Sequence, residues 1–377
     1  MTSVEQFVQL PDPNAFRLTN IEVPPVVDEQ LALFTPEALQ IQDGIPFDPS
    51  TVLSQLLSFE GKHLIAIDIG GHKIAIREGY FVQGRFTIDG GSVLNVDEPI
   101  QGDGENYLTV LEHLAKVTRG RELPVSISTA GLVEKTSLRW SPNATGTVEQ
   151  LNRRYQGDFA NLFGEGMVAV MNDAIAALKR GAVTFKQMDK NIQNVILIIF
   201  SSGLGGAELW NNSIFPQEPG HVRAVDSLNP FQVQTPCKVH PEFVCLENIS
   251  ASGALEKTYP VIHGDQRTGE ELSEIYQNGL GNSVARWLYE RSAFVYAHAV
   301  LGMSLRHGLL SRSEEGKTAI AFHGGATRVP DFAERVMQIV DHHIGFTPQF
   351  LKTHEACPET GNACLDGAAI GAIQLIS

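Results

Sequence analysis

The sequence HLIAIDIGG, residues 63–71, decides the fold. An apolar β-rich run ends there in two glycines, and Asp68 stands near the end of the run. The next two segments, HKIAIREG (72–79) and YFVQGRFTI (80–88), are again β-rich and contain glycine. Short apolar runs separated by glycine turns predict strands that form an antiparallel meander opening a sheet.

Strands and helices alternate through the rest of the chain. Residues 105–119 carry apolar side chains mostly on one helical face, and the strand candidate LPVSIST (123–129) follows. The alternation recurs in MVAVMND with the helix AIAALKRG (167–181), in VILIIF (195–200), and in a long helical stretch that precedes KTAIAFHGG (283–325). This order predicts an α/β protein with two lobes, each built from a sheet and helices.

The changes of pattern suggest four segments. We expect an N-terminal extension (1–58), an N-terminal lobe (59–180) and a C-terminal lobe (181–357), with a last helix (358–377) that packs back on the N-terminal lobe. The extension is rich in proline, which breaks long helices and favours extended segments and turns.

Composition excludes several classes of protein. The formal net charge of −15 argues against a nucleic-acid partner, because such binding needs a basic surface that neutralises phosphates. No apolar run reaches transmembrane length, and the first ten residues, MTSVEQFVQL, lack the basic start and apolar core of a secretory signal. The sequence therefore predicts a cytoplasmic protein that binds neither membranes nor nucleic acid.

Three glycine turns follow predicted strands. They are Asp68–Lys73 after LIAI, Ser201–Gly206 after VILIIF, and Gly324-Gly325 after AIAF. Glycine amides and hydroxyls suit a phosphate, and a carboxylate at a strand end suits a magnesium-bound water. Each turn alone is also typical of a structural hairpin. Their occurrence in both halves favours a nucleotide cleft between two lobes.

From about residue 63 to its end, the chain resembles the ROK family of sugar kinases and regulators. Glu218-Pro219-Gly220-His221 matches the family's Glu-x-Gly-His motif, and Cys245-Leu246-Glu247 matches its Cys-x-Glu segment. Ser141-Pro142-Asn143 and Asn172-Asp173-Ala174 resemble its sugar-contacting asparagine segment and its catalytic Asn-Asp pair. The resemblance implies an α/β, two-lobed actin-like ATPase (ribonuclease H-like) fold with an interlobe cleft.

The resemblance also implies roles for single residues. Asp173 would be the catalytic base, and the sugar would be bound by Asn143, Asn172, Asp173, Glu218, His221 and Glu247. ATP would be bound by Asp68, Gly70, Gly71, Lys73, Ser202, Gly203, Gly205, Gly324 and Gly325. Carboxylate, amide and imidazole groups can satisfy the hydroxyls of a pyranose, which both donate and accept hydrogen bonds. From the residues alone, Asn172-Asp173 is also a helix N-cap, and both roles can hold together.

The four cysteines are too few for a disulfide framework in a chain of 377 residues, which leaves a metal site or plain thiols. The zinc site of the ROK family combines the motif histidine with a Cys-x-Cys-x4-Cys run. Here the middle cysteine is missing and His240 lies beside that position. His221, Cys237, His240 and Cys245 would still suit tetrahedral zinc. A buried thiol pair with an ordinary surface histidine is the alternative.

The predicted function is ATP- and Mg2+-dependent phosphorylation of a hexose or hexose-like sugar, such as glucose, an amino sugar or a cyclitol, by a homodimer. The alternatives are a sugar-binding regulator and a catalytically weak ROK-like protein. His72 motivates the second alternative, because the family usually has threonine there, and Ser201-Ser202 likewise replaces Gly-Thr. A regulator needs a DNA-binding helix pair, and Arg17 is the single basic residue of the extension.

Overall fold

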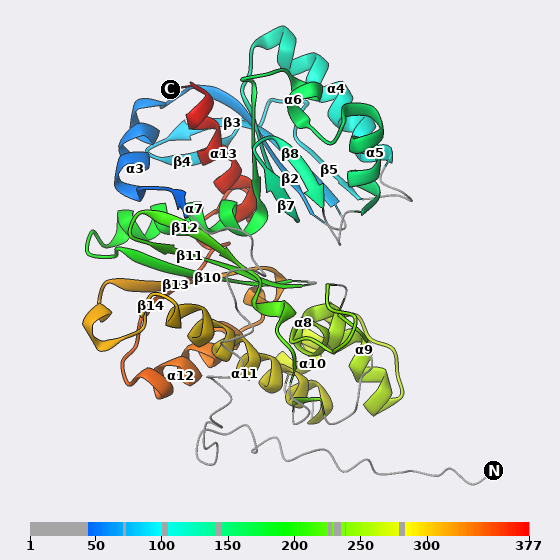
Figure 1. Ribbon diagram of the computed structural model, residues 1–377, viewed down its shortest axis with the longest axis vertical. Helices are drawn as coiled ribbons and strands as arrows, with labels where there is room; N and C mark the ends of the chain where they lie inside the picture. Colours follow the sequence, from blue (N-terminus) through cyan, green and yellow to red (C-terminus); the bar gives the residue numbers. More distant parts are fainter. Residues whose placement is uncertain are drawn as a thin grey trace, which may run out of the picture. The chain divides into compact units, whose positions relative to one another are not determined.

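The computed structural model describes most of the chain (Figure 1), namely residues 44–70, 73–99, 105–140, 145–201, 203–224, 228–229, 235–237, 239–278 and 283–376. The described residues divide into two compact units. The N-terminal unit consists of Gly44–Leu197, Leu209–Phe215 and Leu351–Ser377. The C-terminal unit contains Ile198–Glu208 and Pro216–Phe350. Predictions for Gly71, His72, Asn143 and Ser202 lie outside the described residues, as do those for residues 1–43.

The N-terminal unit is built on a mixed sheet with the strand order β4-β3-β2-β6-β9. Its strands are β2 (His63–Ile69), β3 (Lys73–Val82), β4 (Arg85–Ile88), β6 (Val125–Thr129) and β9 (Val168–Asn172), and β5 (Val96–Pro99) pairs with β3. The antiparallel pairing of β2, β3 and β4 confirms the predicted meander. β2, β6 and β9 are parallel, and β6 is buried along its whole length, as expected for a strand covered on both faces.

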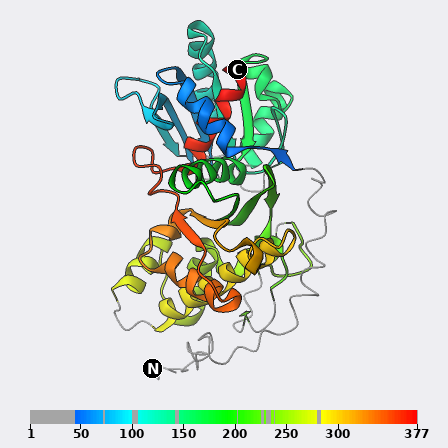
Figure 2. The same ribbon diagram turned by 90° about the vertical axis from the view of Figure 1, so that its left-hand side faces the viewer.

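Helices cover both faces of this sheet (Figure 1). α4 (Glu105–Arg121), α5 (Thr145–Tyr155) and α6 (Phe159–Phe163) share one hydrophobic core with the strands, and the predicted apolar face of α4 is buried through Leu108, Leu111 and Leu114. A hairpin of β7 (Leu132–Glu134) and β8 (Ser137–Trp140) precedes α5. On the other face, visible in Figure 2, lie α3 (Pro49–Ser58), α7 (Asp173–Met188) and α13 (Ala363–Ile376).

The last helix, α13, packs against α7 and against β2, β6 and β9. Small residues make this close approach possible. A Cβ atom at Gly367 would collide with the carbonyl oxygen of Ala176 on α7, and one at Gly371 would collide with the side chain of Met171. The last helix therefore packs on the N-terminal unit, as the sequence predicted, and contributes directly to its core.

α3 replaces the extended segments and turns that the prolines of the extension had suggested. Pro49 is the first helical residue, where proline is tolerated because the missing N–H would have no helical partner. Asp48 caps the helix by accepting a hydrogen bond from the Ser50 backbone N–H (3.0 Å). Leu56 is fully buried, and the helix contacts α7 and α13. Local capping therefore overrides the proline content of the wider segment.

The second sheet has the order β1-β12-β11-β10-β13-β14. Its strands are β1 (Ile45–Pro46), β10 (Asn194–Phe200), β11 (Leu204–Trp210), β12 (Ser213–Gln217), β13 (Thr318–His323) and β14 (Gln349–Lys352). β10 is buried at every residue, which agrees with the uninterrupted apolar run VILIIF. β13 is the strand predicted within KTAIAFHGG.

The helical part of the C-terminal unit follows β12. It consists of the α-helices α8 (Glu247–Ser250), α9 (Ser252–His263), α10 (Gly269–Gln277), α11 (Ser283–Leu305) and α12 (Phe332–Ile344), with the short 3-10 turns η2 (Pro219–His221), η4 (Arg312–Glu314) and η5 (Gly325–Arg328). α11 packs on α12, and the rings of Phe200, Tyr296 and Phe332 join both helices to β10. None of the described helices is long and apolar enough to cross a membrane.

Candidate functional site

Two acidic side chains lie at one edge of the sheet in the N-terminal unit. Asp68 is near the end of β2, opposite Ser128 of β6, and Asn172 ends β9 opposite Thr129 of the same strand. Because the three strands are parallel, their carboxyl ends meet at one edge, which is where ligands bind in open α/β sheets. Asp173 follows β9 directly and begins α7. The fold therefore brings Asp68, predicted to bind ATP, and Asp173, the predicted base, to the same edge.

Asn172 and Asp173 divide two tasks between them. The Oδ1 atom of Asn172 accepts a hydrogen bond from the Ala174 backbone N–H (2.9 Å), and its Nδ2 atom donates to the carbonyl of Gly131 (3.0 Å). Asn172 is thus the N-cap of α7, as the sequence predicted for this pair. The Asp173 carboxylate bonds locally to the Ala174 N–H (2.8 Å) and is partly buried. Asn172 supplies the cap by itself, and one oxygen of the Asp173 carboxylate adds a second acceptor for the same N–H.

Burial and a neighbouring charge change the acidity of Asp173. Desolvation raises its pKa to about 7, and the negative charge of Asp68 contributes to the rise. The pKa of Asp68 is also raised by burial, although the Asn362 amide and the charge of Lys73 act in the opposite direction. A carboxylate whose pKa lies near neutral pH is suited to accept a proton during a reaction.

Asn362 is a site residue that sequence reasoning missed. Its Nδ2 atom donates to Oδ2 of Asp68 (2.8 Å), while its Oδ1 atom accepts from the backbone N–H groups of Cys364 (2.9 Å) and Leu365 (3.2 Å). An asparagine just before an apolar helix is a recognisable capping signal. The contact with Asp68 has no such signal, because the two residues are 294 positions apart.

The first glycine turn is closed by a hydrogen bond from the Gly70 N–H to the carbonyl of Lys73 (3.0 Å). Lys73 begins β3 with an exposed side chain. The third turn follows β13, where Gly324 has a φ of +107°. A Cβ atom there would collide with the carbonyl oxygen of Phe200, and the space around a Cβ at Gly325 is open. Gly324 therefore brings bare backbone to the end of β10.

In the C-terminal unit, the second glycine turn meets two of the predicted sugar-binding motifs. Oε2 of Glu247, on α8, accepts a hydrogen bond from the Leu204 backbone N–H (3.0 Å). A Cβ atom at Gly203 would come within 2.7 Å of that oxygen, and one at Gly220 would collide with the carbonyl oxygen of Leu204. Both glycines are needed for this close approach. Segments up to 43 residues apart therefore form one cluster.

Several hydrogen bonds hold this cluster in place. Ser252 donates to the carbonyl of Ser201 through its backbone N–H (3.0 Å) and its hydroxyl (2.8 Å). Ser292 donates to the carbonyl of Ser250 (3.0 Å), and the buried guanidinium of Arg291 bonds the carbonyl of Ile249. Both residues come from α11, so the longest described helix fixes the short helix that carries Glu247.

Three potential zinc ligands lie together beside this cluster. The ligand atoms of His221, Cys237 and Cys245 are all within 4.8 Å of one another, and Nδ1 of His221 is 3.4 Å from Sγ of Cys237. Two ligands of one tetrahedral zinc ion are separated by about 3.6 Å, given metal bonds of 2.0–2.3 Å. The spacing and the chemistry of these donors therefore fit zinc. All four cysteines of the chain are buried free thiols.

His240, the expected fourth ligand, is not a member of this group. Its ring stacks on Phe243 with 5.2 Å between centroids, and its Nδ1 atom lies 3.7 Å from a carboxylate oxygen of Glu242. The side chain is 39% exposed. In this conformation His240 behaves as a surface histidine.

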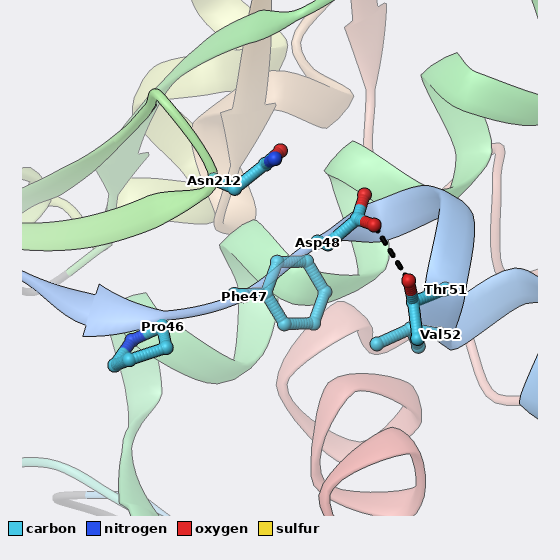
Figure 3. Close-up of a pocket in the computed structure, with 6 residues that line it drawn as sticks. All are labelled: Pro46, Phe47, Asp48, Thr51, Val52 and Asn212. Atoms are coloured by element: carbon cyan, nitrogen blue, oxygen red, sulfur yellow. Dashed lines mark hydrogen bonds between the residues drawn. The ribbon is translucent and has the colours of Figure 1, made fainter.

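A surface pocket lies elsewhere in the N-terminal unit (Figure 3). Its volume is about 300 Å3, and it is lined by Pro46, Phe47, Asp48, Thr51, Val52 and Asn212. Asp48, its acidic residue, already accepts a hydrogen bond from the Thr51 hydroxyl (Figure 3) and, as the cap of α3, another from the Ser50 N–H. The pocket contains none of the predicted site residues.

Comparisons with known proteins agree with the sequence motifs. Residues 64–375 match the family model of the ROK family. No curated protein sequence matches the chain. Among solved structures, a ROK hexokinase from Thermus thermophilus is 19% identical with a TM-score of 0.55, and the match covers 84% of this chain and 99% of that one.

Two further structures are similar to the same extent. A ROK family glucokinase from Streptomyces griseus, in complex with glucose and AMPPNP, is 20% identical, with a TM-score of 0.55 over 82% of this chain and 98% of that one. A ROK family transcriptional regulator, a homologue of the E. coli MLC protein, is 13% identical with a TM-score of 0.56. The match covers 83% of this chain and 80% of that one. At these identities the matches concern the fold, and they confirm the predicted α/β fold of the actin-like ATPase type.

Proposed function

The chain belongs to the ROK family, and on this premise we propose that it transfers the γ-phosphoryl group of ATP to a hydroxyl of a hexose or hexose-like sugar. The observation that carries the proposal is the environment of Asp173. Its carboxylate follows a parallel strand, is not the N-cap of α7, and has a pKa raised to about 7. Such a group can take a proton from a sugar hydroxyl near neutral pH.

In the proposed reaction, the oxygen of the sugar hydroxyl attacks the γ-phosphorus while Asp173 accepts the hydroxyl proton. The bond between the γ-phosphorus and the bridging oxygen breaks, and ADP leaves with that oxygen. When bound, Mg2+ supplies positive charge that neutralises the phosphates. Asp68 is the residue we expect to hold a magnesium-bound water. Its position at the strand end and its partly buried carboxylate fit that role.

The sugar would be bound by hydrogen-bonding side chains. Glu218, His221, Glu247 and Asn143 are the proposed contacts, and Asn172 would contribute mainly by holding the helix that begins with Asp173. The nucleotide would contact the three glycine turns through Gly70, Gly71, Lys73, Ser202, Gly203, Gly205, Gly324 and Gly325. The hydrogen bond from the Leu204 N–H to Glu247 supports a sugar site adjacent to the second turn.

A structural zinc ion is part of the proposal. His221, Cys237 and Cys245 would hold it, and it would fix the end of the Glu-x-Gly-His motif relative to Glu247, two residues after Cys245. The fourth ligand would be a water or His240, whose ring would first have to leave Phe243. Elemental analysis of washed protein measures the zinc content per chain. We expect about one zinc per chain, and the Cys245→Ser variant should lose it while Cys357→Ser keeps it.

A sugar-responsive regulator is the second candidate, because one of the similar structures is a ROK family transcriptional regulator. The near absence of basic residues before Lys62 weighs against DNA binding. A catalytically weak sugar-binding protein is the third candidate. The homodimer and the cytoplasmic location stay predictions.

The decisive experiment is a coupled ADP-release screen with Mg2+ and ATP over hexoses, amino sugars and cyclitols. Sugar-dependent ADP release is expected for at least one class. The Asp173→Asn protein, purified in the same way, is the control for contaminating kinases. Sugar binding without ADP release would reject the kinase function and favour a regulator or a catalytically weak sugar-binding protein. DNA binding that responds to sugar would then identify the regulator.

A further inference from the structure

Asn362, just before α13, and the first turn of α13 itself contact the two elements that carry Asp68 and Asp173. At one end, Asn362 donates from Nδ2 to Asp68 on β2 (2.8 Å). At the other, Asp366 lies 3.6 Å from the buried guanidinium of Arg180 on α7, the helix that begins with Asp173. The thiol of Cys364 also lies 3.6 Å from the backbone carbonyl of Asp173. The chain end therefore links the two carboxylate-bearing elements.

A short hydrogen-bonded turn makes this segment rigid. The Thr360 hydroxyl donates to Oδ1 of Asp366 (2.6 Å), and the Asn362 backbone N–H donates to the same hydroxyl oxygen (3.1 Å). Arg180 also donates to the carbonyl of Ala356 (2.6 Å), and its side chain is 3% exposed. Asn362 is consequently held from its backbone as well as from its side chain, so that its Nδ2 atom has a fixed position.

The chemistry of asparagine suits the two contacts of its side chain. The carbonyl oxygen caps α13 by accepting from the N–H groups of Cys364 and Leu365. The amide nitrogen is then free to donate to a carboxylate. Aspartate could cap the helix but has no donor, and serine could cap it but is too short to reach Asp68. A residue that served only as a cap would not need the amide nitrogen.

We propose that Asn362 is a positioning residue for Asp68, which it holds in one orientation toward the magnesium-bound nucleotide. This inference rests on the proposed kinase function, since it assigns a task to Asp68 in that reaction. The Asn362 amide occupies Oδ2 and so restricts rotation of the carboxylate. Without it, Asp68 would lose a hydrogen bond to its charge and would sample other rotamers before the nucleotide binds.

The first test is calorimetric binding of Mg2+·ADP to the full chain. Asn362→Ser keeps a cap for α13 and Asn362→Gly weakens it, but both remove the donor to Asp68. Both variants should bind Mg2+·ADP about 10- to 100-fold more weakly, the usual effect of losing a hydrogen bond to a charged group. Sugar affinity should be unchanged. Asp158→Ala, which removes the cap of α6 in the same unit, is the matched control and should bind Mg2+·ADP normally.

The second test is a double-mutant cycle with Asp68→Asn. If Asn362 acts through Asp68, adding Asn362→Ser to Asp68→Asn should cause no further loss of Mg2+·ADP affinity. Additive losses would overturn the proposal, as would wild-type affinity in Asn362→Ser or an equal loss in Asp158→Ala. If wild-type protein binds Mg2+·ADP but phosphorylates no sugar, the proposed kinase function is rejected and the proposed role of Asn362 is not. Wild-type protein that binds no Mg2+·ADP would reject both.

Discussion

Each unit of the protein holds a partly buried acidic side chain at its proposed site, but the surroundings of the two differ. Burial, together with the charge of the nearby Asp68, raises the pKa of Asp173 to about 7. Glu247 instead accepts a hydrogen bond from the Leu204 N–H, and Gly203 and Gly220 leave the space for that contact. Burial and, to a smaller extent, repulsion between like charges prepare a carboxylate to take a proton, whereas a backbone donor fixes its direction. We therefore assign catalysis to the first and recognition to the second.

The most severe test of this contrast is Asp173→Asn. The amide cannot accept the hydroxyl proton but can still hydrogen-bond, so turnover should fall by about 10²–10⁴-fold while sugar affinity changes little. The fold should survive because Asn172, not Asp173, caps α7. Turnover and a separate sugar titration are the measurements. Asp189→Asn, at the other end of α7, is the matched control, and near-normal turnover in Asp173→Asn would refute the assigned base.

Gly220→Ala tests the crowded cluster of the C-terminal unit. The added methyl would meet the backbone carbonyl of Leu204, which cannot rotate away, so the turn must shift. We expect a loss of about 1–3 kcal/mol in the free energy of unfolding, together with weaker sugar binding. Thermal unfolding and sugar titration measure both effects. Gly253→Ala, in the open first turn of α9, should leave both unchanged or slightly raise the stability.

The pH dependence of kcat/KM separates the two carboxylates. Since Asp173 must be ionised to act, and its pKa is about 7, kcat/KM should fall about tenfold for each pH unit below that value. Glu247→Gln should weaken sugar binding without moving this acid limb. A limb near pH 4 in the wild-type protein, or a limb moved by Glu247→Gln, would contradict the division of roles.

The smallest expected effect concerns stability. Asp173 has a pKa of about 7 in the folded protein against 3.8 as the ordinary value, so the folded state binds more protons between these pH values. The free energy of unfolding must therefore decrease as the pH rises through this window, with the full cost present above pH 7. Asp173→Asn removes that cost. Its melting temperature should exceed that of the wild type by roughly a few degrees at pH 8, and the difference should shrink toward pH 4. An equal difference at both pH values would argue against the raised pKa.

The sequence by itself determined the features that depend on neighbouring residues. The meander after His63 follows from alternating strands and glycine turns, and the cap at Asn172 follows from an Asn-Asp pair before an apolar helix. Gly324 stands where a strand ends against another backbone, and its positive φ agrees with the glycine pair predicted there. For the meander and the cap the physical cause lies within a few residues, so the pattern is visible in the chain, whereas the close approach of Gly324 to Phe200 depends on the packing of β13 beside β10. The family motifs added the roles that were then proposed for these positions.

Only the tertiary structure decided which distant side chains share a hydrogen bond, a charge or a metal. Asn362 gave a capping signal, but its contact with Asp68 depends on how α13 packs against β2. The raised pKa of Asp173 depends on burial and on a carboxylate from another strand. His240 matched a zinc ligand in type and spacing, yet its ring stacks on Phe243 instead of joining His221 and the cysteines. Hydrogen bonds and metal–ligand bonds form only when the two atoms are placed to within a few tenths of an ångström. The spacing of residues in the sequence does not fix atomic positions that closely, so packing across the fold decides which of these contacts form.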